Sequence, residues 1–194
     1  MLLRASLLRG YTLKAGEAKW DWPIGGMAEM PEMVAKTSGR YLRPAKAEEC
    51  GALSALALRS KAYWGYDPRF IQACRDELAV HPANARAGRV VVLVEEDTPL
   101  GFYALDPGER RDEGEVSLLF VEPAVIGRGI GRALWDHAVA MARRQGLKRL
   151  KVLSDPFALG FYRSVGATLS GKVRSSVRAP DGSERSLPVL HYEL

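Results

Sequence analysis

The stretch VEPAVIGRGIGRALWDHA, residues 121–138, places Gly127, Gly129 and Gly131 at alternate positions after Pro123. The residues that follow repeat their apolar side chains at helical spacing, so we expect a helix to begin at the glycines. Glycine weakens a helix, because its backbone loses more conformational freedom than that of any other residue. Three glycines at a helix start therefore indicate that the backbone there serves something besides the helix.

The start of a helix is a natural anion site. Its first N–H groups lack intrahelical acceptors, and the helix dipole places positive charge at the same end. Glycine would let a pyrophosphate lie against this backbone, where a Cβ would hold it off. Arg128 and Arg132 add positive charge. The alternative is a glycine-rich turn between a strand and a helix that binds no ligand.

Two common phosphate-binding loops do not fit these residues. The P-loop needs a second glycine at position 132, which is Arg132. The dinucleotide fingerprint GxGxxG/A would need glycine or alanine at Arg132 or at Leu134, depending on the register. The remaining pattern is a strand ending in V-x-P, followed by x-x-x-G-x-G at the start of a long helix.

Composition bounds the class of protein. The chain has 194 residues, of which 47% are hydrophobic and 26% charged, as in a globular domain, and it has no apolar run as long as a membrane span. Cys50 and Cys74 form no CxxC pair, which suggests free thiols in a reducing, cytoplasmic location. The three histidines lack metal-ligand spacing, so we expect no metal. Because no apolar run is long enough, we also expect no membrane association.

The net charge of +5 is concentrated locally. Residues 128–151 hold seven Lys or Arg and one acid, Asp136, and this segment should attract anions. A solvated helix face, a nucleic-acid surface and a site for a phosphorylated cofactor would all produce such a segment.

The chain divides near residue 38. Residues 1–38 show no sustained period, and we interpret them as a disordered extension or a start assigned too early, with a targeting peptide as a weaker alternative. Residues 39–194 form one regular domain. We expect strands over 41–44, 89–97, 98–106, 114–123, 147–155, 168–179 and 185–194, with a turn at 97–99, and helices over 49–64, 69–80, 130–144 and 156–167. This order predicts an α/β fold: a mixed sheet with helices on both faces.

The segments VSLLFVEPAVIGRGIGRALWDHAVAMARRQG and LKVLSDPFALGFYRSVGA resemble the acetyl-CoA-binding core of the GNAT N-acetyltransferase superfamily. The loop pattern of that family is [Q/R]-x-x-G-x-[G/A]. Gly129 and Gly131 match its glycines, and Ile126 departs from it at the first position. An aromatic-Tyr pair before a glycine is matched by Phe161, Tyr162 and Gly166. The resemblance covers residues 40–194. It implies a mostly antiparallel sheet that splays between two parallel strands.

The resemblance also implies a mechanism, in which an amine attacks acetyl-CoA directly. Tyr162 would protonate the leaving thiolate, and Glu115, which should share a strand face with Ser117 and Leu119, is the candidate base. Glu115 could equally be a surface glutamate, and Glu95 and Glu96 are weaker candidates. Phe157 replaces an asparagine that many members carry. The residues expected to contact acetyl-CoA are Leu119, Phe120, Val121, Ile126, Gly127, Arg128, Gly129, Ile130, Gly131, Arg132, Ser154 and Phe161.

The resemblance implies that two parts of the chain contact the acceptor amine: the segment between the first two helices, and the closing strands. The candidates to contact it are Tyr63, Trp64, Tyr66, Ser176 and Arg185. A small molecule, an amino acid or a peptide would all supply a primary amine, and a homodimer stays open. Two alternatives to the enzyme remain: a sensor that binds acyl-CoA without turnover, and a nucleic-acid module, which Trp135 as the one nearby aromatic favours little.

Overall fold

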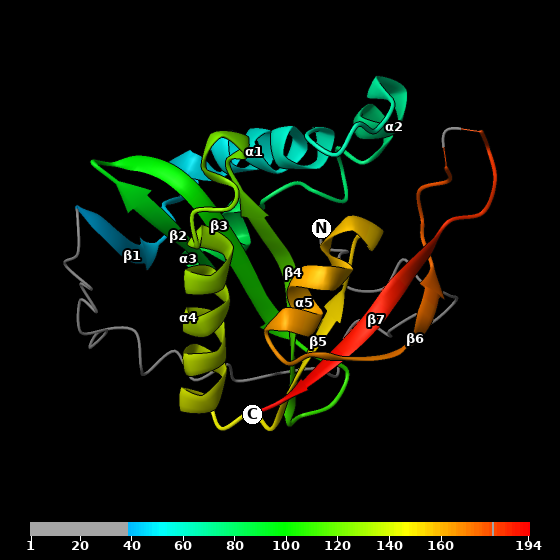
Figure 1. Cartoon of the computed structure of the whole chain (residues 1–194). Coiled ribbons are helices and arrows are strands. Elements are labelled where there is room, and N and C mark those ends of the chain that lie inside the picture. Colours follow the sequence, from blue (N-terminus) through cyan, green and yellow to red (C-terminus); the bar gives the residue numbers. More distant parts are fainter. Residues whose placement is uncertain (1–38, 180) are drawn as a thin grey trace.

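The computed structural model describes residues 39–179 and 181–194, so the predicted N-terminal extension lies outside the described residues. The strands in this part of the chain are β1 (Arg40–Pro44), β2 (Val90–Glu95), β3 (Thr98–Pro107), β4 (Glu113–Val121), β5 (Arg149–Leu153), β6 (Thr168–Arg174) and β7 (Ser186–Glu193). The α-helices are α1 (Cys50–Ala62), α2 (Pro68–Ala73), α3 (Pro82–Arg86), α4 (Ile130–Arg144) and α5 (Leu159–Ser164). Single 3-10 turns precede α1, α4 and α5 (Figure 1).

The strands form one sheet in the order β1-β2-β3-β4-β5-β7-β6. All neighbouring strands in it are antiparallel except β4 and β5, which are parallel. Helices cover both faces, as Figure 1 shows for α1 and α4. The predicted mixed sheet with helices on both faces is therefore confirmed.

Two hydrophobic cores hold the helices on the sheet. On one face Leu134 and Trp135 of α4 pack with β3, β4, β5 and α5, and both side chains are fully buried. On the other face Leu53 and Leu56 of α1 pack on β2 and β3. The buried positions of both helices recur at helical spacing. In α4 they form one apolar stripe, whereas in α1 they also include Ser60 and Lys61.

The predicted helix over 69–80 is wrong in extent. Asp67 does cap the helix, accepting a hydrogen bond from the Arg69 N–H, but α2 ends at Ala73. Leu78 and Val80 are both buried in the α1-side core, and the Val80 N–H donates to Ser54 Oγ. That packing draws the chain out of the helix, and Pro82 then opens the unpredicted helix α3.

The turn between β2 and β3 also differs from the prediction of 97–99. It consists of Glu96 and Asp97, whose φ values of 48° and 63° lie in the left-handed region. Two such residues make a tight hairpin whose twist matches the strands. Pro99 belongs to β3, and the pairing of β3 with β4 begins two residues later, at Gly101.

Candidate active site

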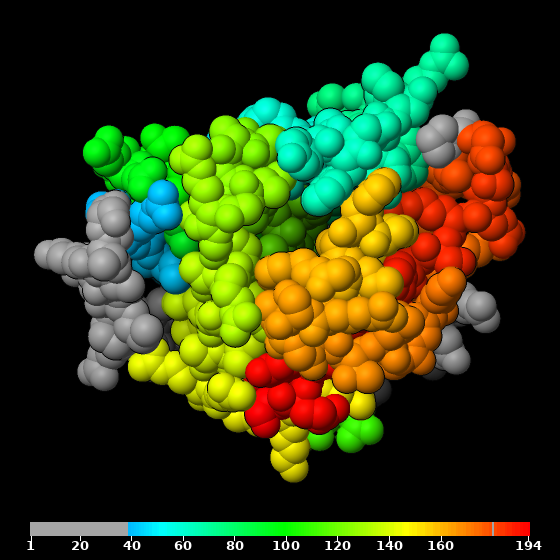
Figure 2. Space-filling view, in the orientation of Figure 1, coloured from blue at the N-terminus to red at the C-terminus, as the bar shows by residue number. Residues whose placement is uncertain are grey.

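A cavity opens where two parallel strands diverge. β4 and β5 pair over Glu113–Glu115 and Arg149–Lys151 only, while the other edge of β5 pairs with β7 along the whole of Arg149–Leu153. Beyond Glu115, within the described residues, the edge of β4 that faces β5 has no strand partner. A cavity of about 650 Å³ lies there, lined by β4, the turn before α4, α5 and the end of α1 (Figure 2).

The glycine turn lies at one wall of this cavity. Gly127 and Gly129 have φ values of 84° and 79°, which L side chains rarely adopt, so backbone conformation alone requires glycine there. Gly129 is the N-cap of α4. Ile126, Gly127, Gly129, Gly131 and Arg132 line the cavity, so the predicted anion site opens onto it.

Gly131 differs from its two neighbours. Its backbone is helical, and a Cβ placed on it would meet nothing closer than the Phe161 ring at 3.6 Å, an ordinary van der Waals contact. The described chain therefore has room for alanine at this position, and alanine would favour the helix. The fold gives no reason for this glycine.

Two predicted contacts of the turn are altered by its internal hydrogen bonds. The Arg128 N–H donates to the Val125 carbonyl at 3.2 Å, and the Ile126 N–H donates to the Pro123 carbonyl at 3.3 Å. The Arg128 side chain is exposed and does not line the cavity, while Ile130 is buried in the α4 core. The free amides of the turn are thus fewer than the sequence suggested.

A bulge in β4 makes one part of the predicted strand face wrong: Leu119 does not share a face with Glu115. The pairing with β3 shifts between Val116 and Leu118, so Ser117 is an extra residue in β4. Two consecutive residues then face the α1 side, and Leu119 packs instead with the α4-side core. Glu115 shares its face with Ser117, as predicted, but not with Leu119.

Glu115 lines the cavity at the point of divergence. Its carboxylate lies 3.7 Å from Lys151 Nζ, and Lys151 is the residue directly opposite on β5. Burial raises the pKa of Glu115 above the ordinary value of a glutamate, and the Lys151 charge opposes that rise. A carboxylate with a raised pKa is a better proton acceptor from an amine than an exposed one.

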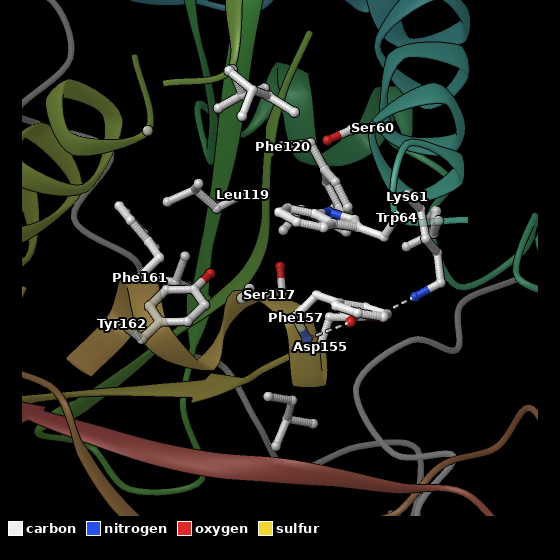
Figure 3. A pocket seen from close by; sticks show the side chains of 18 of the residues that line it. Ser60, Lys61, Trp64, Ser117, Leu119, Phe120, Asp155, Phe157, Phe161 and Tyr162 are labelled. Carbon is white, nitrogen blue, oxygen red and sulfur yellow. Dashed lines mark hydrogen bonds and ion pairs between the residues drawn. The ribbon is translucent and has the colours of Figure 1, made fainter. Parts of the chain in front are cut away.

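Tyr162 and Phe161 come from α5. Tyr162 is almost fully buried, packs edge-on against Trp135, and directs its hydroxyl into the cavity (Figure 3). Burial raises the pKa of this phenol, so it stays protonated at neutral pH. Phe161 lines the cavity beside Gly131.

The opposite wall holds an ion cluster that the sequence analysis did not identify. Asp155 accepts hydrogen bonds from Lys61 Nζ at 2.7 Å and Arg185 Nη2 at 2.9 Å, and Tyr66 Oη donates to it at 2.9 Å. Burial opposes ionisation of Asp155, but the charge and hydrogen bond of Lys61 outweigh it and lower the pKa of the carboxyl. Burial and the Asp155 charge raise the pKa of Tyr66 to about 12.

Aromatic side chains connect the two sides of the cavity at this wall. The rings of Trp64 and Phe157 stack with centroids 5.5 Å apart and planes 7° apart, and both are partly exposed (Figure 3). Trp64 follows α1 and Phe157 follows β5. The position where an asparagine was expected thus holds one half of an aromatic pair.

The predicted acceptor residues divide into two groups. Trp64, Ser176 and Arg185 line the cavity, whereas Tyr63 does not and Tyr66 lies behind Asp155. Of the other candidates, Leu119, Phe120 and Val121 line the cavity. Ser154 does not: it is buried, and its hydroxyl donates to the Asp155 carbonyl.

The weaker base candidates lie elsewhere. Glu95 pairs with Arg40 at the β1–β2 edge, and Glu96 is in the hairpin turn. Trp135, the one aromatic of the basic segment, is buried and offers no surface for stacking bases. In the part of the chain that the structure describes, no helix is long and apolar enough to cross a membrane.

Residues 40–167 match the acetyltransferase (GNAT) family. The chain belongs to this family. Among its relatives, the peptidyl-lysine N-acetyltransferase YjaB of Salmonella typhimurium is 35% identical over 82 residues, 42% of this chain and 51% of YjaB. An amino-acid acetyltransferase of Ralstonia nicotianae is 31% identical over 122 residues, 63% of this chain and 25% of the relative. The chain thus spans about half the length of the first relative and a quarter of the second.

Solved GNAT structures share the fold. The PaiA N-acetyltransferase of Thermoplasma acidophilum, in complex with coenzyme A, has a TM-score of 0.63 at 14% identity and covers 80% of this chain and 99% of its own. The YncA protein of Salmonella typhimurium, a putative acetyltransferase solved with acetyl-CoA, has a TM-score of 0.60 at 20% identity. The match covers 81% of this chain and 95% of YncA. The predicted family and fold are confirmed.

Proposed function

We propose that this chain is an N-acetyltransferase that moves an acetyl group from acetyl-CoA to a primary amine. One observation carries the proposal: the glycine turn at the start of α4, Glu115 and Tyr162 all open onto one cavity. Membership of the GNAT family supports the choice of acetyl-CoA. The three features would meet the three requirements of the reaction: the glycine turn would bind the cofactor, Glu115 would be the base, and Tyr162 the acid.

The cofactor would lie along the diverging strands. The pyrophosphate would accept hydrogen bonds from the free amides around Gly129 and Gly131, where the α4 dipole adds positive potential. The pantetheine arm would pair with the unpartnered edge of β4, as an added strand does. Gly131 supports this placement, because no contact within the described chain requires glycine there.

The reaction then needs two proton transfers. The amine nitrogen attacks the thioester carbonyl, the C–N bond forms, and a main-chain N–H near Phe120 or Val121 stabilises the oxyanion. Glu115 takes the proton of the amine, directly or through water. The C–S bond breaks, and Tyr162 gives its proton to the leaving thiolate.

The test measures binding and turnover separately. Wild-type protein should bind acetyl-CoA in calorimetry and release free thiol with at least one member of an amine and peptide panel. Glu115→Gln and Tyr162→Phe should each keep acetyl-CoA affinity and lose roughly 100-fold or more in kcat, as expected for general acid–base groups.

Two results would contradict the proposal in different ways. Binding of acetyl-CoA without thiol release on any amine would identify an acyl-CoA sensor. Full rates in both variants would leave acetyl transfer standing but remove the roles given to Glu115 and Tyr162.

A further inference from the structure

Two cations share one anion on the cavity wall formed by the end of α1 and the segments after β5 and before β7. Lys61 Nζ and Arg185 Nη2 both donate to the same oxygen, Asp155 Oδ2. Their side chains are only 9% and 10% exposed, and both residues line the cavity. One carboxylate thus accepts hydrogen bonds from two nearly buried positive charges.

Asp155 has no capacity left for a substrate. Besides the two cations, its oxygens accept from Tyr66 Oη and from the Phe157 N–H at 3.0 Å. A substrate ammonium would have to displace one of these donors. Asp155 is thus a fixed part of the wall.

Lys61 and Arg185 each have more N–H donors than their hydrogen bonds to Asp155 use. An ammonium has three N–H donors and a guanidinium has five. Apart from the bond to Asp155, the described partner of the Arg185 guanidinium is Ser175 Oγ at 3.5 Å, a weak contact. The Arg185 guanidinium and Lys61 Nζ also lie over the Phe70 ring, at 5.1 and 5.4 Å, which holds both in place.

A second carboxylate lies on the same wall. Glu77 lines the cavity, is half-buried, and accepts a hydrogen bond from the exposed Ser176. Water and salt screen a half-buried carboxylate more than they screen the nearly buried charges of Lys61 and Arg185. The nearly buried cations should therefore dominate the potential that a ligand meets in the cavity.

Resting on the proposed function, we propose that the acceptor amine bears a carboxylate, and that Lys61 and Arg185 bind this carboxylate. The guanidinium offers two parallel donors that match a carboxylate, and the Lys61 ammonium adds a charge-assisted bond. The Trp64–Phe157 pair beside them would contact the apolar part of the same molecule. Free amino acids are the simplest amines with these features.

The experiment compares matched acceptors on the wild-type protein. The panel contains L-amino acids, the corresponding amino-acid amides, and the decarboxylated amines, each assayed for thiol release at saturating acetyl-CoA. We expect the carboxylate forms to have a kcat/KM roughly 10- to 100-fold above that of their amides, the range for charge-assisted hydrogen bonds. This comparison needs no variant and stands even if a variant fails to fold.

Variants then assign the effect to residues. Lys61→Met and Arg185→Gln should each raise KM for the carboxylate acceptor roughly 10-fold or more while KM for its amide and the affinity for acetyl-CoA stay unchanged. Arg174→Gln is the matched control, because Arg174 pairs with Glu184 on the exposed surface of β6 and does not line the cavity. It should change none of these constants.

Three outcomes would overturn the inference. One is an equal kcat/KM for carboxylate acceptors and their amides. Another is an equal rise in KM for both kinds of acceptor in the Lys61 and Arg185 variants. Preference for diamines over amino acids would make Glu77 the determinant instead. In each case thiol release continues, whereas no release with any amine would contradict the proposed function itself.

Discussion

Some single residues in the cavity are not required by the fold alone. Gly131 is helical and has room for a Cβ, and Glu115 holds a carboxylate in a partly buried position. Glycine in a helix and a partly buried carboxylate each make the native state less stable than an alanine or an apolar side chain would. Each can therefore be tested by separating its effect on stability from its effect on the site.

Gly131→Ala should stabilise the protein and weaken its hold on acetyl-CoA. Alanine in a helix is favoured over glycine by up to about 1 kcal/mol, while its methyl group would lie where the pyrophosphate approaches the backbone. Gly51→Ala is the control, because Gly51 lies in the first turn of α1 with nothing within 4 Å of a Cβ. Denaturant melts should show a gain in both variants, and calorimetry a loss of affinity in Gly131→Ala alone. If both variants bind acetyl-CoA with unchanged affinity, the pyrophosphate does not lie against the backbone at Gly131.

Lys151→Met should move the acid limb of the rate profile to higher pH. The base must be ionised, so kcat/KM falls as pH drops through the pKa of Glu115. Burial raises that pKa and Lys151 lowers it, so losing the lysine raises it further. Lys148→Met removes the same charge from an exposed position and should leave the limb in place. Identical profiles for the two variants would show that Glu115 is not the titrating base.

At the scale of elements, the site depends on how closely β3, β4 and α4 pack. A Cβ on Gly101 of β3 would lie 2.7 Å from the Phe120 carbonyl oxygen and 3.0 Å from Leu134 Cδ1. The carbonyl belongs to the strand that forms the cavity wall. Any shift that relieves the clash therefore moves the residues proposed to hold the acetyl group.

Gly101→Ala should destabilise the protein by about 1–3 kcal/mol, the usual cost of overpacking, and should also weaken acetyl-CoA binding. Gly171→Ala in β6 is the matched change, since a Cβ there meets nothing within 4 Å. It should be neutral in urea melts and in calorimetry. A stable Gly101→Ala variant with normal affinity would mean that β4 adjusts without disturbing the cavity.

The sequence predicted those elements whose signals are local. The apolar stripe of α4 and the β-branched run of β2 were both visible in the residues themselves. The end of α2 was not, because it depends on the burial of Leu78 and Val80 against α1. Helical periodicity cannot register a competing tertiary contact.

The same limit applies to the site. Gly127 and Gly129 predicted the turn. The bulge at Ser117 arises from pairing with β3, and the sequence of β4 alone does not indicate it. The Lys61–Asp155–Arg185 cluster joins residues up to 124 positions apart in the chain. Only the fold brings them to one wall, although Asp155 before Pro156 could have been marked as a capping carboxylate.

For the whole molecule, the diverging strands create a weak seam that a ligand can close. Three residue pairs join β4 to β5, whereas β3 and β4 pair along their length. Beyond Glu115 the seam is open between β4 and β5, while the core around Trp135 of α4 and the ion cluster at Asp155 join its two sides. A molecule that bonds to both sides of it should stabilise the native state as a unit.

Acetyl-CoA at 100 times its Kd should therefore raise Tm by roughly 5–10 °C. Binding at that excess adds about 2.7 kcal/mol to the free energy of unfolding, and each kcal/mol shifts Tm by about 2–4 °C for a domain of this size. Pantetheine lacks the pyrophosphate and should give a much smaller shift at the same concentration, as should acetyl-CoA added to Gly131→Ala. Scanning calorimetry of the full chain measures all three. Equal shifts for pantetheine and acetyl-CoA would mean that the α4 amides contribute nothing to binding, and the glycines of the turn would then serve the backbone alone.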